Sequence, residues 1–299
     1  LGVREVARIR KEMDSIKTVT GFAGDLPAFF NYVKTDRKFF PFTTEEEVLN
    51  RFRSFREKMA PAISKMFHLL PKADFEIRAT EKFRQAGANA QYNRGSRDGT
   101  RPGVFYEVIP DATQYNYHDM ETLFLHEAVP GHHFQIALQL EMNAPEFMKS
   151  SFVGAFSEGW GLYAETLGQA MGMYTDPYQY LGRLNADMER SVRLVVDVGL
   201  HYKGWSREKA VDYILANQPM TREVAESRVE RFMVIPAQAL SYKIGEQKIL
   251  ELRALAMSKL GNRFSLPAFH DEVLKNGAVP LSILDANIKG WINSQLKNK

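Results

Sequence analysis

Two histidines and a glutamate that could bind and use a metal ion lie close together in the sequence, at His126, Glu127 and His132. In many zinc peptidases, two histidines four residues apart on one helix hold the ion, and a glutamate beside the first histidine is the general base. Here Pro130 stands where the second histidine would be. On an unbroken helix His126 and His132 would point about 240° apart, so they could not bind one ion. A metal site therefore requires an interruption of the helix.

The Pro130-Gly131 pair predicts such an interruption, because proline removes a backbone donor and glycine permits unusual dihedral angles. We expect a bulge or kink there that brings His132 to the metal-facing side. The alternative second ligand is His133, which shares a face of a straight helix with His126. That spacing would place the two side chains about 10 Å apart along the axis, which is too far for one zinc ion. His132 is therefore preferred, and His133 stays an alternative.

A third ligand is expected on a later helix, in the mostly apolar segment 156–165. Glu158 and Glu165 lie seven residues apart in it, and so on one helix face. A carboxylate on an apolar face is costly unless it is paired or bound to a metal. We predict that Glu158 is the third ligand and that Glu165 holds a ligating histidine; pairing of both with buried arginines is the alternative. These ligands leave room for a water molecule on one Zn²⁺ per chain, and Glu127 would act on that water as general base.

Four further residues are candidates for roles around the metal. Tyr242 and His201 could each donate a hydrogen bond to the oxyanion that forms during hydrolysis. Asp197 precedes His201 by four residues, so the two side chains can meet on a helix and fix the imidazole. Arg101, in an Arg-Pro-Gly turn, could bind a substrate carboxylate or lie beside an edge strand that takes extended peptide. A structural role is the alternative for each.

The elements that must position these side chains are mostly helices. Residues 1–70 show helical spacing, and 43–59 begins with a threonine cap and acidic residues. Glycine and proline turns divide the stretch 71–117, whose strand candidate 104–110 predicts a small β subregion. The later helices are expected at 118–129, 131–140, within 178–216, from 221 onward and at 240–259. The predicted fold class is mainly α with one small β-sheet.

Composition excludes several other classes of protein. The 299 residues are 44% hydrophobic and 25% charged, as in globular proteins, and the net charge is only +3 with both signs interleaved. No basic patch for nucleic acid and no apolar run long enough for a membrane span are present. The absence of cysteine excludes disulfides and thiol chemistry. The chain begins at Leu1 without a signal-like segment, so we expect a fragment or a processed form.

Longer stretches of the sequence resemble one bacterial family. HEAVPGHHFQ (126–135) and SEGWGLYAE (157–165) are similar to segments of the zincin-like proteins grouped as domain-of-unknown-function family 885. The resemblance covers essentially the whole chain, and the proline-glycine pair belongs to the family pattern. Further similar segments are SRDGTRPGVFY (96–106), RLVVDVGLHYKGWSREKA (193–210), IPAQALSYKIGEQKILELR (235–253) and FHDEVLKNGAVPLSIL (269–284).

The resemblance implies a helical zincin fold akin to the thimet-oligopeptidase and carboxypeptidase Taq class. Residues 1–299 would form a single catalytic region, the C-terminal part of a longer protein whose N-terminal region is missing. In that class a glutamate ligand follows the second histidine by roughly 25 residues; here the interval from His132 to Glu158 is 26. The implied gluzincin-type ligand set is therefore His126, His132 and Glu158.

The implied activity is that of a zinc metallopeptidase acting on peptides. One alternative is a zinc amidohydrolase acting on a small non-peptide amide. Another is an inactive, metal-containing peptide-binding protein, against which the presence of Glu127 argues, because a purely structural site needs no base. The resemblance also implies a periplasmic or cell-envelope location, with the cytoplasm as the alternative.

Overall fold

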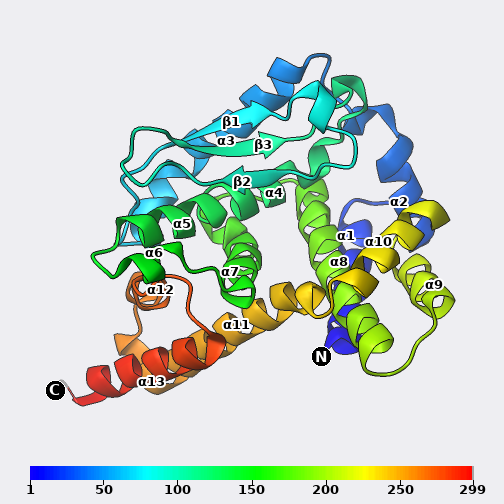
Figure 1. Cartoon of the computed structure of the whole chain (residues 1–299). Coiled ribbons are helices and arrows are strands. Elements are labelled where there is room, and N and C mark those ends of the chain that lie inside the picture. Colours follow the sequence, from blue (N-terminus) through cyan, green and yellow to red (C-terminus); the bar gives the residue numbers. More distant parts are fainter. Residues whose placement is uncertain (298–299) are drawn as a thin grey trace. The chain divides into compact units, whose positions relative to one another are not determined.

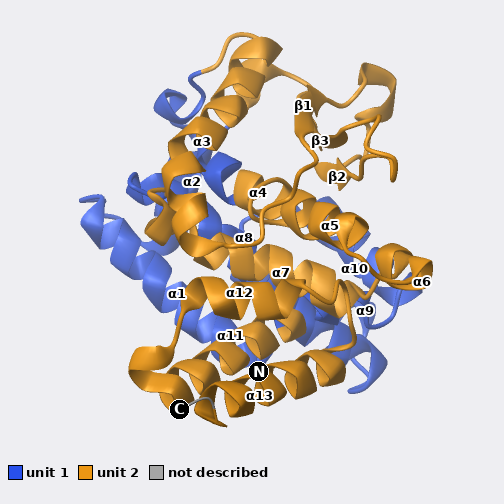
Figure 2. Ribbon diagram, turned by 90° about the vertical axis from the view of Figure 1, so that its left-hand side faces the viewer, with its two compact units in different colours: residues 1–41, 116–122, 174–243 blue, residues 42–115, 123–173, 244–299 orange. Residues whose placement is uncertain are grey.

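Helices form most of the computed structural model, which describes residues 1–297, and one small three-stranded mixed sheet completes it (Figure 1). The predicted fold class is thus confirmed. The chain divides into two compact units, each assembled from separate stretches (Figure 2). Unit 1 comprises 1–41, 116–122 and 174–243, and unit 2 comprises 42–115, 123–173 and 244–299. None of the described helices is both long and apolar enough to cross a membrane.

Unit 1 is organised around two long helices that pack along each other, α1 (Gly2–Val19) and α8 (Pro177–His201). Their buried faces and those of the shorter helices share one apolar core, with members such as Ile9, Leu184 and Val229 fully buried. Burial of this kind is the main source of stability for such a helical assembly. The shorter helices of unit 1 are α2 (Leu26–Thr35), α9 (Arg207–Asn217) and α10 (Arg222–Val234).

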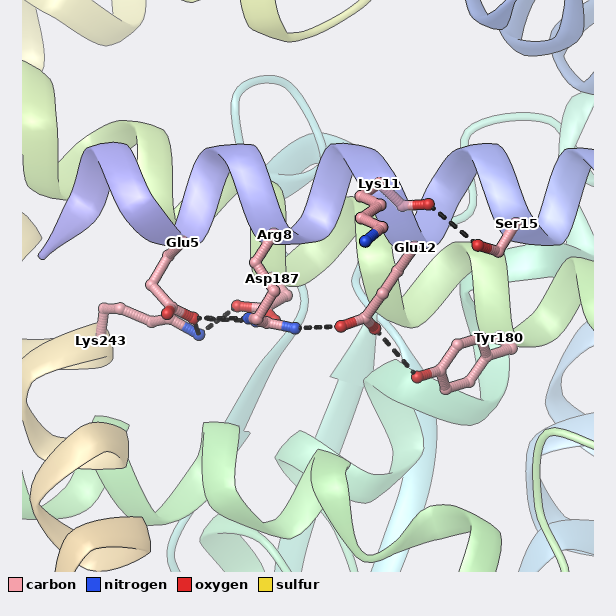
Figure 3. Close-up of polar contacts among 8 residues, drawn as sticks. All are labelled: Glu5, Arg8, Lys11, Glu12, Ser15, Tyr180, Asp187 and Lys243. Atoms are coloured by element: carbon pink, nitrogen blue, oxygen red, sulfur yellow. Dashed lines mark hydrogen bonds and ion pairs between the residues drawn. The ribbon is translucent and has the colours of Figure 1, made fainter.

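A network of charged side chains crosses unit 1 beneath α1 (Figure 3). Lys243, which is fully buried, pairs with the buried carboxylate of Asp187 and lies 3.4 Å from Glu5. Arg8 donates to Asp187 over 2.8 Å and pairs with Glu12 over 2.6 Å. The network links residues that are far apart in the sequence, and it compensates a lysine charge that would otherwise be costly to bury.

Unit 2 contains the sheet and the helix that covers it. The helix α3 (Glu45–Met66) begins with a capping box in which Thr44 and Glu47 bond to each other's backbone, as the sequence predicts. Phe52 of α3 packs edge-on against Phe105, with ring centroids 5.3 Å apart. The sheet order is β1-β3-β2, with β1 parallel and β2 antiparallel to β3. The strands are β1 (Phe75–Ala79), β2 (Gln91–Asn93) and β3 (Gly103–Glu107).

Among the remaining helices of unit 2, α5 (His132–Glu141) lies at the predicted segment 131–140 and α7 (Gly154–Thr166) contains the segment 156–165. The others are α6 (Glu146–Ser150), α12 (Leu266–Leu274) and α13 (Leu281–Lys297). Two more helices, α4 (Met120–Glu127) and α11 (Ser241–Leu260), contribute their later residues to unit 2. Short 3-10 turns complete the chain: Arg37–Phe39, Lys82–Arg84, Ala112–Gln114, Tyr117–Asp119, Gly168–Met171, Gln238–Leu240 and Gly261–Arg263.

His270 of α12 is a fully buried histidine that ties α12 to its neighbours in unit 2. Its Nδ1 lies 2.8 Å from the carbonyl oxygen of Met66, so it donates there. Its Nε2, 2.8 Å from the hydroxyl of Tyr163, therefore accepts. Burial is the main cause that lowers the pKa of His270 to about 4. The imidazole is thus held neutral in the folded protein.

This histidine predicts a pH dependence of stability. Below pH 6.5 the unfolded chain binds a proton at His270, whereas the folded protein does not bind it until the pH approaches 4. The contribution of the neutral His270 to the free energy of unfolding is therefore complete above pH 6.5 and is lost as the pH falls towards 4. Between pH 7.5 and pH 5 the free energy of unfolding should fall by about 2 kcal/mol more in the wild type than in His270→Gln. Urea titrations of both proteins in chelator would measure the difference, and parallel pH curves would contradict it.

Candidate metal centre

The helix that carries the first histidine is interrupted where the sequence predicts. The helix α4 ends at Glu127, α5 begins at His132, and the Val129–Pro130 peptide bond between them is cis. The indole Nε1 of Trp160, on α7, donates to the carbonyl oxygen of Pro130 over 2.7 Å. The break is therefore a fixed part of unit 2, anchored by the helix that faces it.

Gly131 makes the interruption possible because the chain passes very close to itself there. A Cβ atom at this position would collide with the carbonyl oxygens of His126 and Leu125. No other residue type fits without a shift of the backbone. Because of this close passage, His132 lies beside His126. On a continuous helix the two side chains would point in different directions.

The side chains of His126, His132 and Glu158 converge on one point in unit 2. The two imidazole rings lie 4.7 Å apart, nearly perpendicular to each other. The Oε2 atom of Glu158 is 3.7 Å from Nε2 of His126 and 3.5 Å from Nε2 of His132. These distances are long for hydrogen bonds. They match the separation of about 3.4 Å between two ligands of a tetrahedral zinc ion.

Glu127 completes the group. Potential ligand atoms of His126, Glu127 and His132 all lie within 4.8 Å of one another, so these residues could hold a metal ion. The Glu127 side chain is buried, and its Oε2 has no hydrogen-bond partner within residues 1–297. A buried carboxylate oxygen without a donor is costly. A cation or its bound water would satisfy this oxygen.

Glu165 fixes the orientation of His126 from the opposite side. Its Oε1 lies 2.8 Å from Nδ1 of His126, and both side chains are almost fully buried. With a metal bound, Nδ1 would carry the hydrogen and Nε2, which faces Glu158, would offer its lone pair to the ion. Burial alone would lower the pKa of His126, but Glu158 and Glu165 raise it to about 9. Burial would raise the pKa of Glu158, but the two histidines hold it well below its usual range.

The residues present therefore fit a divalent metal ion. Two imidazoles and carboxylates are ligands that zinc accepts, and their separations suit a single ion. The excess of carboxylates around the two imidazoles makes the centre electrostatically favourable for a cation. The same donors also accept other divalent ions.

His133, the alternative second ligand, contacts the sheet. Its Nδ1 lies 3.0 Å from the hydroxyl of Tyr92 on β2, and its ring packs against Phe75 of β1 with centroids 4.4 Å apart. Burial lowers the pKa of His133 to about 4. Burial also raises the pKa of the neighbouring Tyr92 hydroxyl to about 12. His133 thus connects α5 to the sheet, whereas His132 faces His126.

The other predicted site residues have local partners of their own. In unit 1, the exposed His201 donates from Nε2 to the carbonyl oxygen of Phe232 over 2.9 Å. The buried carboxylate of Asp197 accepts from the backbone of Ala237, the residue with φ of 67° that precedes α11. The hydroxyl of Tyr242 lies 3.5 Å from Nε2 of Gln238. These contacts stabilise the local structure of unit 1. The catalytic roles of Tyr242 and His201 stay predictions.

Arg101 belongs to unit 2 and is exposed in the turn before β3. Its backbone is held by Ser96, which accepts from the Arg101 amide through its hydroxyl over 2.9 Å and donates its own amide to the Arg101 carbonyl over 2.9 Å. Its charge acts on the hydroxyl of Tyr92 on the edge strand β2. The turn is therefore tied down by its backbone, while the guanidinium lies near an edge strand.

Sequence reasoning did not single out Gly161 and Trp160, which support the metal centre from α7. A Cβ at Gly161 would lie 2.7 Å from Cε1 and 2.9 Å from Nε2 of His126, so only glycine leaves room for that imidazole. The signal in the sequence was the pair of glycines that flank a tryptophan beside Glu158, although the first of them, Gly159, packs against Gly245 and not against the metal centre.

Replacing Gly161 by alanine is therefore expected to push the His126 ring aside. We expect metal affinity to fall by about 10- to 100-fold, the range found when groups that orient a ligand are lost. Competition with a chromogenic chelator would measure it. The matched control is Gly290→Ala in α13, where an added Cβ meets nothing within 4 Å. Equal affinities of the two variants would contradict the orienting role.

Comparisons with known proteins agree with this fold. A search of the curated proteins finds no match. The crystal structure of a candidate lipoprotein from Colwellia psychrerythraea is 36% identical, with a TM-score of 0.93, over 98% of this chain and 52% of that one. A candidate lipoprotein of unknown function from Shewanella oneidensis shares the fold, with 21% identity and a TM-score of 0.80, over 98% of this chain and 55% of that one. The chain thus spans about half the length of these two structures.

The family comparison covers nearly all of the chain. The family model that matches is described as bacterial protein of unknown function (DUF885), and the match extends over residues 1–288. It includes all of unit 1, unit 2 as far as residue 288, and every residue of the candidate metal centre. The chain therefore belongs to the DUF885 family of bacterial proteins.

Proposed function

We propose that the protein is a zinc-dependent hydrolase that cleaves peptide bonds. The observation that carries the proposal is the convergence of His126, His132 and Glu158 at separations suited to one tetrahedral ion. The buried, unpaired carboxylate oxygen of Glu127 beside them supports a catalytic and not merely structural metal site. In this assignment Glu158 is the third ligand and Glu127 the base.

The roles of the chain's own residues follow from their contacts. Bound Zn²⁺ would act as a Lewis acid and make a coordinated water acidic near neutral pH. Glu127 accepts that water's proton and returns it to the leaving amine, which requires a buried carboxylate free to take a proton. Glu165 holds His126 in the tautomer whose Nε2 is a ligand. The role of Tyr242 and His201 as hydrogen-bond donors to the oxyanion does not follow from their contacts and stays a prediction from the sequence.

A peptide is the proposed substrate because β2 is an edge strand. In the order β1-β3-β2 only one side of β2 is paired within the sheet, and an extended peptide could add to its other side. His133 reaches β2 through Tyr92, so the edge strand and α5 of the metal centre are in direct contact. Arg101 near Tyr92 is the proposed group for a substrate carboxylate. A small non-peptide amide remains the alternative substrate.

We also propose a location at the cell envelope. The support is the name of the two similar structures, both described as candidate lipoproteins, one of which shares 36% identity with this chain. The periplasmic side would expose peptides of envelope proteins to the site. Fractionation of cells that produce the protein from its own gene would check this.

The first experiment is metal analysis combined with a peptide library. Elemental mass spectrometry should find about one zinc per chain in the wild type and in His133→Ala, and none in His132→Ala, because His132 faces His126 whereas His133 contacts Tyr92. The wild type should then cleave library peptides in a chelator-sensitive way. Metal binding without cleavage would favour the inactive peptide-binding alternative. A wild type that binds no zinc when it is supplied would refute the proposal.

A further inference from the structure

The two histidines of the candidate metal centre have different surroundings. Nδ1 of His126 lies 2.8 Å from Oε1 of Glu165. Nδ1 of His132 is also buried, but it has no hydrogen-bond partner within residues 1–297. A histidine that binds a metal through Nε2 carries its hydrogen on Nδ1 and normally donates that hydrogen to an oxygen atom. Metal binding would therefore leave the Nδ1–H group of His132 in need of an acceptor.

An oxygen atom that lacks a donor belongs to Gln135, on the same helix as His132. Oε1 of Gln135 is buried and has no hydrogen-bond partner in the described part of the chain. The two residues are three positions apart on α5, so their side chains are neighbours on the helix surface. Long side chains on a helix lean back over the preceding turn. This direction brings the amide of Gln135 towards the turn that begins at His132.

Gln139, one turn further along α5, determines which end of the Gln135 amide is free. Its Nε2 donates to the carbonyl oxygens of Met148 and Ser151, over 2.7 and 2.9 Å, so both hydrogens are used. Its Oε1 accepts from the backbone amide of Ala278 over 3.2 Å. Nε2 of Gln135 donates to the same oxygen over 2.8 Å. The unpaired end of Gln135 is therefore the oxygen, which is an acceptor only.

A buried donor and a buried acceptor that lack partners would each lower their cost by bonding to each other. Leaving such groups unpaired in the interior is unfavourable for both. Another buried oxygen without a partner near His132 belongs to Glu127. That oxygen is already assigned to the metal-bound water in the proposed function, and Gln135 does not compete with it.

We propose that Gln135 is a positioning residue of the metal centre, whose Oε1 accepts the Nδ1 hydrogen of His132 when Nε2 of that histidine holds a metal ion. Gln135 then orients His132 as Glu165 orients His126. An amide oxygen on one histidine and a carboxylate on the other make the two imidazoles unequal in basicity. The proposal rests on the metal binding of the proposed function but not on peptide cleavage.

The first test is NMR of zinc-loaded protein with ¹⁵N-labelled histidine. In the wild type, the Nδ1–H resonances of both His126 and His132 should lie downfield, because both groups donate hydrogen bonds. Gln135→Met keeps the length of the side chain and removes its oxygen. In this variant the His132 resonance should move upfield or be lost by exchange with water, whereas that of His126 should stay. A His132 resonance that is the same in both proteins would overturn the proposal.

The second test is zinc affinity, measured by competition with a chelator in the absence of substrate. Gln135→Met should lower the affinity by about 10- to 100-fold, as expected when a group that orients a ligand is lost. The matched control is Gln139→Met, which removes the bond between the two glutamines and the bonds to three backbone groups but keeps the oxygen of Gln135. This control should lower the free energy of unfolding more than Gln135→Met does, and the zinc affinity less.

The opposite order of the two variants in stability and in affinity distinguishes positioning from a structural role. A zinc affinity that falls in parallel with stability, and therefore most in Gln139→Met, would overturn the proposal. A wild type that binds no zinc would refute it together with the proposed function. Zinc binding with the expected difference between the variants, but without peptide cleavage, would support the role of Gln135 and contradict the proposed function alone.

Discussion

Replacing Glu127 by glutamine is expected to abolish most peptide hydrolysis while leaving the metal in place. The amide keeps the shape of the side chain but cannot accept a proton, so the rate should fall by about 10²- to 10⁴-fold, the usual contribution of a general base. Zinc content should stay near that of the wild type, because the proposed ligands are His126, His132 and Glu158. Steady-state peptide hydrolysis and elemental analysis of the same preparation measure both quantities.

A surface glutamate of unit 2 provides the control for this substitution. Glu146→Gln on α6 removes the same charge from a side chain that is 65% exposed and pairs with Arg97, and it should leave kcat/KM unchanged. Loss of zinc in Glu127→Gln would instead identify Glu127 as a ligand, which its place among the possible ligand atoms allows. Full activity in Glu127→Gln would rule out its role as the base.

Removing the carboxylate of Asp187 is expected to have the largest effect on stability. Asp187→Ala would remove the buried carboxylate that pairs with the fully buried Lys243, whereas Glu5 would stay 3.4 Å from the lysine. Breaking a buried ion pair from one side typically costs about 3–5 kcal/mol. The free energy of unfolding from urea titration at neutral pH should fall by an amount in this range.

Two further variants separate the ion pair from the loss of volume. Asp212→Asn removes an exposed carboxylate that pairs with Arg222, and such a surface pair should contribute no more than about 1 kcal/mol. Joint replacement Asp187→Leu with Lys243→Met should recover most of the loss, because both charges of the buried pair are then removed together. An Asp187→Ala variant as stable as Asp212→Asn would show that the network in Figure 3 contributes little.

The elements of the fold were largely predictable because their signals are local. The cap at Thr44 and the strand in 104–110 each depend on a few neighbouring residues, and both appear near the expected place, the strand as β3. The interruption at Pro130-Gly131 was predictable for the same reason, since proline and glycine act on the backbone at their own positions. Glu158, the proposed third ligand, was singled out through the cost of a carboxylate in an apolar segment.

What the sequence did not reveal depends on contacts between distant segments. Nothing near Lys243 indicates that its partners are Asp187 and Glu5, which lie far away along the chain. The passage of the His126 ring against Gly161 depends on how closely α4 and α7 pack. The contact of His133 with the sheet similarly requires the position of Tyr92. The spacing of residues along a helix can identify candidates for buried or functional positions. It does not show which residues of distant segments they contact.

The interrupted helix has a consequence for recognising metal sites in other sequences. In this chain the two histidines that face each other are six residues apart, and the turn at Pro130-Gly131 makes that spacing workable. A pattern search that demands histidines four apart would pass over every protein built in this way. A pattern that admits a proline-glycine insertion, followed about 26 residues later by a glutamate in a glycine-containing helix, would retrieve them. Genomes screened only with the shorter pattern therefore undercount candidate metal centres of this kind.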